Sequence, residues 1–122
     1  MNNKNIPRSF KYAIQGFKIA FFNEFKIRLH CAIVVVVVTG GLLLNLSILE
    51  WISVVISMGI VLITELINTS IETLSDTLHP DVSEGIKNTK DIAASAVLIA
   101  STTALTIGLI VFIPYLCQYF KI

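Results

Sequence analysis

The chain alternates long apolar runs with short polar segments, and three of the runs are long enough to cross a membrane. They cover about residues 29–46, 50–78 and 92–116. Roughly 20 apolar residues in a helix span a hydrocarbon core of about 30 Å. A backbone in lipid must satisfy its own hydrogen bonds, so we expect helix even at the five consecutive valines of 34–38. The pattern predicts an all-α membrane protein with three transmembrane helices.

The segment before the first run, about residues 8–28, has a different periodicity. Its apolar positions recur every three or four residues, and its basic residues lie largely elsewhere; the apolar positions are Phe10, Ile14, Phe17, Phe21 and Phe25. A basic helix with an aromatic face is typical of a helix that lies on the membrane surface. An ordinary amphipathic core helix is the alternative.

The connections between the runs also carry signals. Residues 45–48 form a very short turn in which Ser47 can cap the following helix. Gly40 and Gly41 allow a neighbouring helix to approach closely. His79-Pro80 opens the longest hydrophilic loop, 79–91. The length of 122 residues allows one domain, 1–122.

Composition agrees with a membrane protein. Hydrophobic residues make up 55% of the chain and charged residues only 14%, whereas a soluble domain is about a quarter charged. The net charge of +1 gives no indication of nucleic-acid binding. Cys31 and Cys117 have no motif spacing, and we expect both to be reduced. We expect no cleavable signal peptide, because the first apolar run begins near residue 31.

Basic residues indicate the orientation. Most of them precede the first span or lie in the 79–91 loop: Lys4, Arg8, Lys11, Lys18, Lys26, Arg28, Lys87 and Lys90. Only Lys121 lies on the other side. The excess of Lys and Arg on cytoplasmic segments therefore predicts a multi-pass protein whose amino terminus and 79–91 loop face the cytoplasm.

A polar face interrupts the second span. Glu65, Asn68, Glu72 and Asp76 follow the spacing i, i+3, i+7, i+11, which places them on one face of a helix. An ionisable residue within an apolar span indicates a functional site by default. The alternative is that Glu72 and Asp76 merely form the wet end of the helix. The set as a whole predicts a polar site that opens toward the cytoplasm.

These residue types suit phosphoryl transfer. Carboxylates can hold Mg²⁺, and a lysine such as Lys90 can neutralise phosphate charge. A partly desolvated carboxylate can act as a base on an alcohol, and an alcohol arriving from the bilayer would belong to a lipid. The chain lacks the G-x-x-x-x-G-K phosphate loop, so an ordinary nucleotide-binding fold is excluded.

Two motifs identify a family. The segment from Glu65 to Glu72 reads E-x-x-N-[TS]-x-I-E, and Lys90-Asp91 follows downstream. With Asn23-Glu24, Arg28 and the three spans, the chain resembles the small bacterial integral-membrane diacylglycerol kinases, which include the undecaprenol kinases. The resemblance implies a homotrimeric bundle with composite active sites between subunits. It also implies an ATP- and Mg²⁺-dependent lipid kinase of the bacterial cytoplasmic (inner) membrane.

The resemblance also implies roles for individual residues. Glu65 matches the general base of the family, and Glu24 and Glu72 match its metal-bridging acids. The positions that contact nucleotide are Tyr12, Glu24, Glu72, Asp81, Ser83, Lys90 and Asp91. The positions near the lipid substrate are Arg8, Arg28, Glu65 and Asn68.

The lipid acceptor is indicated by shorter segments. Arg28-Leu29-His30, Glu50-Trp51 and His79-Pro80 look more like the undecaprenol kinase branch, so undecaprenol is the first choice and diacylglycerol the second. Ser70, Thr89 and Ser95 depart from the family pattern without removing any proposed catalytic group.

Other readings of the polar residues remain. His30 and His79 are interpreted as packing or capping residues, with metal binding as the alternative. Two non-enzyme alternatives stay open: a small oligomeric channel or ion carrier in which Glu65 is a pore or relay acid, and a non-catalytic packing subunit.

Overall fold

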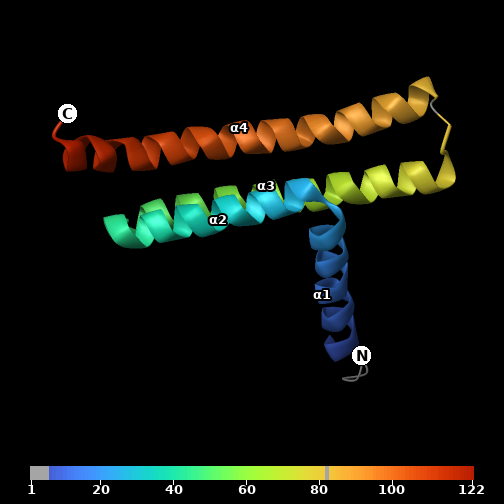
Figure 1. Ribbon diagram of the computed structural model, residues 1–122, viewed down its shortest axis with the longest axis horizontal. Coiled ribbons are helices and arrows are strands. Elements are labelled where there is room, and N and C mark those ends of the chain that lie inside the picture. The colour runs from blue at the N-terminus through green and yellow to red at the C-terminus, as the bar shows by residue number, and fades with distance from the viewer. Residues whose placement is uncertain (1–5, 82) are drawn as a thin grey trace.

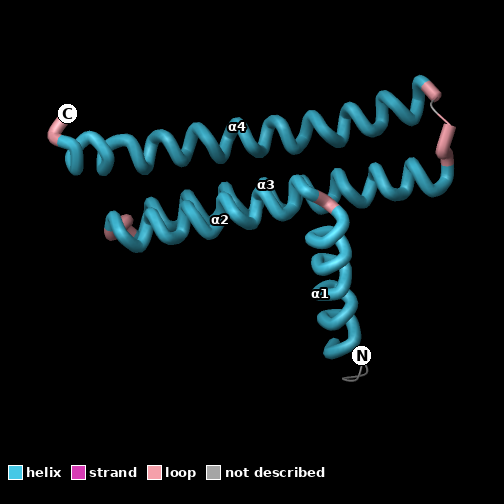
Figure 2. The backbone as a smooth tube through the Cα atoms, viewed as in Figure 1, coloured by secondary structure: helices cyan, strands magenta, loops and turns pink. Residues whose placement is uncertain are grey.

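The computed structural model describes residues 6–81 and 83–122, and these residues form four helices and no strand. The helices are α1 (Ile6–Asn23), α2 (Phe25–Leu44), α3 (Ile48–Leu78) and α4 (Glu84–Phe120). In Figure 1, α2, α3 and α4 lie side by side with α3 running opposite to the other two, while α1 projects at a steep angle. Figure 2 shows that only short connections separate the helices. The predicted all-α class is confirmed.

Three of the helices, α2, α3 and α4, are long and apolar enough to cross a membrane. Helices of 31 and 37 residues, α3 and α4, measure roughly 46 and 56 Å at 1.5 Å per residue. Both lengths exceed the ~30 Å hydrocarbon core, so the two helices extend beyond it. Many large apolar side chains point outward, including Val36, Leu43 and Ile110. In a bilayer the lipid chains contact such an apolar surface, so no other part of the protein has to bury it.

The chain changes direction at Glu24. This residue has extended backbone angles (φ −116°, ψ 117°), and it separates α1 from α2. The predicted surface helix of 8–28 therefore ends at Asn23, and α2 begins at Phe25, ahead of the predicted span. The side chain of Arg28 donates hydrogen bonds of 2.9 Å to the carbonyl oxygens of Phe21 and Phe22. It thus satisfies carbonyl groups that a helix end leaves without partners.

The turn between α2 and α3 is built as its sequence predicts. Asn45 ends α2 in the left-handed conformation (φ 55°), which Asn tolerates better than most residues. The Ser47 side chain accepts a hydrogen bond from the Glu50 backbone, and the Glu50 carboxylate accepts one from the Ser47 backbone. This reciprocal capping box starts α3. Glu50 also accepts a hydrogen bond of 2.6 Å from Tyr115, which ties α3 to α4 at this end.

The connection between α3 and α4 is shorter than the predicted hydrophilic loop of 79–91. Ser83 caps α4, its side chain accepting a hydrogen bond from the Ile86 backbone at 3.2 Å. The helix therefore starts at Glu84, whereas the sequence places the start of the span at about 92. Polar residues form helices readily in water. The polarity of residues 84–91 therefore indicates that this part of α4 is exposed to water, and it does not indicate a loop.

A small apolar cluster packs beside the α2–α3 turn. Its buried members are Leu46, Val54 and Val111, and partly buried Trp51 and Tyr115 pack against them. Gly41 permits this packing, because a Cβ there would lie 2.7 Å from the Trp51 ring. At Gly40 a Cβ would meet only Phe112, at an ordinary 3.6 Å. The predicted close approach at the glycine pair thus occurs at Gly41.

The two glycines give a matched test of this packing. We expect Gly41→Ala to lower the free energy of unfolding by about 1–3 kcal/mol, because overpacking forces the rigid indole to move. Gly40→Ala should be neutral or slightly stabilising, because Ala favours helix over Gly. Denaturant titration in detergent micelles, followed by the fluorescence of Trp51, measures both. Equal stability of the two variants would contradict the packing account.

Candidate active site

Glu65 and Asn68 form the buried part of the polar face on α3. Their exposed fractions are 1% and 2%. Oε2 of Glu65 and Oδ1 of Asn68 have no hydrogen-bond partner among the described residues. A buried acceptor without a partner costs about 1–3 kcal/mol, and folded proteins keep few of them. These two atoms are therefore the acceptors of the polar face that still need a donor.

The polar face continues from Asn68 to Glu72. The Asn68 amide donates to Oε1 of Glu72 over 3.4 Å, a long and therefore weak hydrogen bond. Glu72 is only half-buried, so its carboxylate keeps lone pairs for other ligands. The face thus runs from a buried carboxylate to an accessible one, as the spacing in the sequence predicts.

Beyond Glu72, an ion pair joins α3 to α4. Lys90 Nζ lies 2.7 Å from Oδ1 of Asp76, the last member of the polar face. Lys87 pairs with Asp91 one turn along α4. Both lysines and both acids line one cleft of about 200 Å³, whose walls are Asp76, His79, Pro80, Asp81, Ile86, Lys87, Lys90 and Asp91. A cleft with two cations among carboxylates can accept phosphate groups and an accompanying metal ion.

Three of the predicted nucleotide-contacting residues, Asp81, Lys90 and Asp91, are brought together in this cleft. Ser83 lies beside it and caps α4. Sequence reasoning placed Asp76 on the polar face but gave it no role. Its contact with Lys90 depends on how α3 and α4 pack, and the spacing within one helix does not report that.

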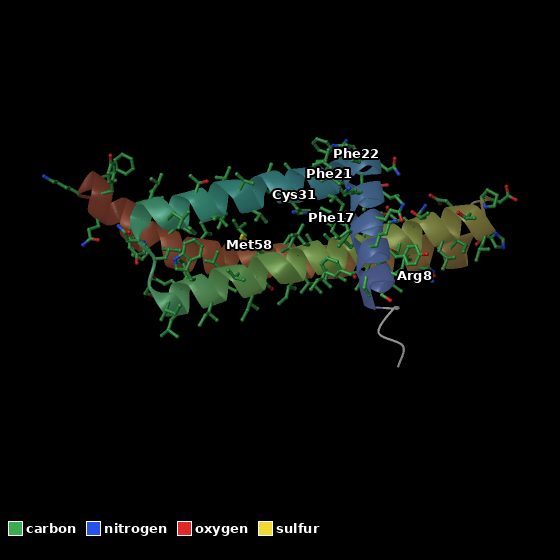
Figure 3. The ribbon with its side chains drawn as sticks, turned by 90° about the horizontal axis from the view of Figure 1, so that it is seen from below. Arg8, Phe17, Phe21, Phe22, Cys31 and Met58 are labelled. Atoms are coloured by element: carbon green, nitrogen blue, oxygen red, sulfur yellow. The ribbon has the colours of Figure 1, made fainter. Side chains whose placement is uncertain are left out.

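The predicted residues of the amino-terminal part do not line this cleft. Arg8 and Tyr12 are exposed on α1, and Glu24 is half-buried at the α1–α2 junction. Figure 3 shows Arg8 near the end of α1 that is remote from α2. Among the described residues, no hydrogen bond or ion pair joins Arg8, Tyr12 or Glu24 to the acids of α3. Arg28 binds the carbonyl groups at the end of α1.

The acidic residues fit one type of metal site better than another. Within the described part of the chain, no three His, Cys, Asp or Glu side chains lie close enough to hold a metal ion together. The described residues of one chain therefore do not form a complete metal cage by themselves. Mg²⁺ is commonly held by one or two carboxylates together with waters and substrate phosphates. Glu72, half-buried and beside the cleft, is a donor of that kind.

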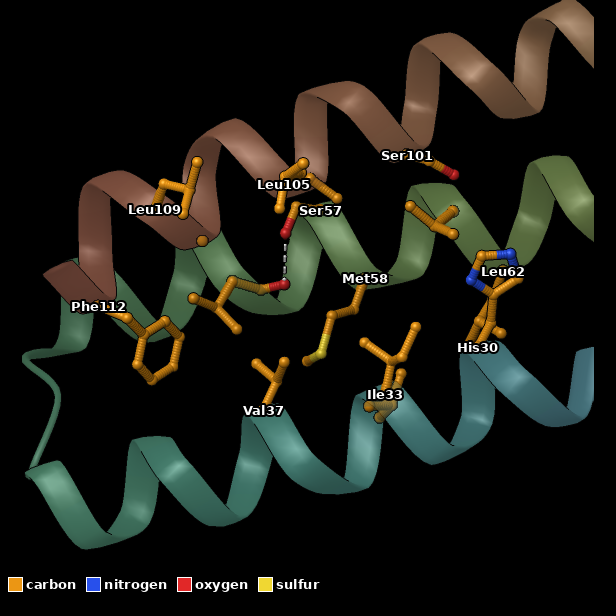
Figure 4. Close-up of a pocket in the computed structure, with 15 residues that line it drawn as sticks. His30, Ile33, Val37, Ser57, Met58, Leu62, Ser101, Leu105, Leu109 and Phe112 are labelled. Carbon is orange, nitrogen blue, oxygen red and sulfur yellow. Dashed lines mark hydrogen bonds between the residues drawn. The ribbon is translucent and has the colours of Figure 1, made fainter.

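His30 is a neighbour of Glu65 that sequence reasoning did not identify. Its Nε2 lies 3.9 Å from Oε2 of Glu65, across the interface between α2 and α3. The contact depends on how α2 and α3 are aligned along their length. The residue pattern within each helix does not determine that alignment, so the contact cannot be predicted from the sequence. His30 also borders an apolar cavity of about 290 Å³ between α2, α3 and α4 (Figure 4).

Comparison with known proteins agrees with these motifs. Residues 11–112 match the family described as prokaryotic diacylglycerol kinase. The chain is 34% identical over 111 residues to a diacylglycerol kinase of Synechocystis sp., and this match covers 90% of the chain but 63% of that longer protein. It is 33% identical to an undecaprenol kinase of Bacillus subtilis, with 89% of both proteins covered. A diacylglycerol kinase of Haemophilus influenzae is 32% identical, with 79% of the chain and 81% of that protein covered.

The family match extends over most of the chain and includes both motifs, the polar face of α3 and Lys90-Asp91. The resemblance deduced from the sequence is confirmed. The chain belongs to the prokaryotic diacylglycerol kinase family, a family of membrane lipid kinases.

Proposed function

We propose that this protein is an ATP- and Mg²⁺-dependent kinase that transfers the γ-phosphate to the hydroxyl group of a membrane lipid. The observation that carries the proposal is Glu65, a carboxylate buried in an apolar helix with an unpaired oxygen. A hydroxyl that reaches this carboxylate from the bilayer would donate a hydrogen bond to it. The carboxylate is then placed to take the hydroxyl proton as the oxygen attacks phosphorus.

The remaining residues of α3 and α4 would bind the nucleotide. Lys90, oriented by Asp76, supplies positive charge to the phosphates, and Asp81 and Asp91 line the same cleft. Ser83, the cap of α4, would contact the nucleotide from the start of that helix. Glu72 and Glu24 would hold Mg²⁺, which neutralises charge on the phosphates when bound. Asn68 connects the two parts of the site, because its amide contacts Glu72 while its own oxygen stays unpaired beside Glu65.

We propose that the complete site is composite, in a homotrimer. Among the described residues, no hydrogen bond or ion pair joins Glu24, Tyr12 or Arg8 to the acids of α3, which leaves these side chains available to the site of a neighbouring subunit. The outward apolar side chains of α2 and α4 offer surfaces for such packing. Arg28, beside the start of the first span, would lie near the lipid head group.

Undecaprenol is the favoured acceptor, and diacylglycerol is the alternative. Identities of 34% and 33% to relatives of the two kinds do not separate them. The preference comes from three short segments that resemble the undecaprenol kinase branch: Arg28-Leu29-His30, Glu50-Trp51 and His79-Pro80. The relative named undecaprenol kinase also matches this chain over 89% of its own length.

The first non-enzymatic alternative is a channel or ion carrier. It would use Glu65 as a pore acid, but it assigns no joint task to Glu72, Asp76 and Lys90. A non-catalytic packing subunit leaves the unpaired oxygen of Glu65 without a purpose. Protection of the protein by Mg-nucleotide, abolished in Glu72→Ala, separates the kinase from both rivals.

The first test concerns Glu65. Protein in micelles receives ATP labelled on the γ-phosphate, with undecaprenol and diacylglycerol supplied separately. We expect Glu65→Gln to lower kcat by about 10²–10⁴, because it keeps the shape of the side chain but removes the base. Glu84→Gln, an exposed acid in the first turn of α4, is the matched control and should retain activity. Equal activity of Glu65→Gln and wild type would refute the assigned role.

A second test concerns Lys90. Replacement by Gln removes the charge that would meet the phosphates, and we expect the KM for ATP to rise by roughly tenfold or more. Lys121→Gln, at the other end of α4, should leave the KM unchanged. Steady-state kinetics at saturating lipid measures both variants. An unchanged KM in Lys90→Gln would exclude this lysine from the nucleotide site.

The orientation in the bacterial cytoplasmic membrane gives a third test. We propose that the amino terminus and residues 79–91 face the cytoplasm, as the distribution of Lys and Arg favours. In a variant lacking Cys31 and Cys117, a cysteine at Ser83 should resist a membrane-impermeant thiol reagent in intact spheroplasts. A cysteine at Lys121 should react. The opposite labelling pattern would reverse the topology.

A further inference from the structure

The imidazole of His30 faces the carboxylate of Glu65 across the α2–α3 interface. The distance from Nε2 to Oε2 is 3.9 Å, and the two side chains are 17% and 2% exposed. Figure 4 shows the ring projecting from α2 toward α3. The oxygen that it faces is the one without a hydrogen-bond partner among the described residues.

No other basic side chain of the described residues lies within ion-pair distance of Glu65. On α4, Lys87 and Lys90 pair with Asp91 and Asp76. On α2, Arg28 binds the carbonyl groups of α1. On α3 itself, the Asn68 amide is directed to Glu72. Among the basic side chains of the described residues, His30 is therefore the nearest to the unpaired oxygen.

The distance between His30 and Glu65 is slightly too long for a hydrogen bond. A hydrogen bond between N–H and O spans about 2.7–3.2 Å, so the observed distance is longer by roughly 1 Å. Catalytic hydrogen bonds are often long without substrate and shorten when it binds. A buried carboxylate also needs such a donor, because an ionised group in an apolar surrounding is costly without one.

We propose that His30 is a positioning residue of this kinase, whose Nε2–H donates a hydrogen bond to Oε2 of Glu65. The bond holds the carboxylate so that its other oxygen faces the lipid hydroxyl. It requires the tautomer in which Nε2 carries the proton. The inference rests on the proposed role of Glu65 as the base.

A packing role is the competing account, because His30 also borders the apolar cavity together with Ile33 and Val37. The two accounts differ in what they require of the side chain. Packing requires volume at this position. Positioning requires a donor at the place of Nε2, which the amide of Gln can supply and the shorter amide of Asn cannot reach.

The test compares His30→Gln, His30→Asn and His30→Leu with wild type in the labelled-ATP assay. We expect His30→Leu and His30→Asn to lower kcat by about 10–100-fold with an unchanged KM for ATP, because a misplacement of 1 Å at a reacting group can cost that much. His30→Gln should restore most of kcat. Ile33→Ala, which opens the same cavity from the same helix, should remain close to wild type.

Equal kcat in wild type, His30→Leu and His30→Asn would overturn the inference. Equal losses in the Gln and Asn variants would overturn it in favour of packing, and this comparison decides the matter even if His30→Leu does not fold. In a Glu65→Gln background, His30→Leu should cause no further loss, because the two residues act as one unit. A wild-type protein that labels neither lipid would instead refute the proposed function itself.

Discussion

The rest of the structure depends on one constraint, the presence of the Glu65 carboxylate inside an apolar bundle. Lipid offers no hydrogen bonds, so a polar group at this depth must find its partners within the protein or in a bound molecule. α3 meets this constraint by presenting Glu65, Asn68 and Glu72 on one continuous face. That face leads to the ion pair between Asp76 and Lys90 and so connects the buried carboxylate with the polar cleft.

The opposite end of the bundle is built from different interactions. There the capping box of Ser47 and Glu50 starts α3, and Tyr115 joins the same carboxylate from α4. The Trp51 ring packs against the bare backbone of Gly41. Polar contacts at this end are satisfied and apolar contacts are close, whereas the end with Glu65 keeps unpaired acceptors. The chain thus separates the part that fixes the helices from the part that we propose as the active site.

The sequence predicts the features that depend on one helix at a time. Periodicity locates the three spans and the polar face, and local chemistry identifies the cap at Ser47 and a close approach at the Gly40-Gly41 pair. It does not predict the break at Glu24, because amphipathic spacing continues through that residue and Arg28 stabilises the break by contacts outside its own helix. It does not predict the contact between His30 and Glu65 either, because that contact depends on the register between two helices.

The contact of Arg28 with the last carbonyl groups of α1 has a mechanical consequence. Two hydrogen bonds fasten the end of the surface helix to the first turn of α2, so the two helices cannot reorient independently while the bonds hold. A bilayer that thins or thickens changes the tilt of a spanning helix. While the two bonds of Arg28 hold, α1 therefore turns together with α2 when the tilt of α2 changes.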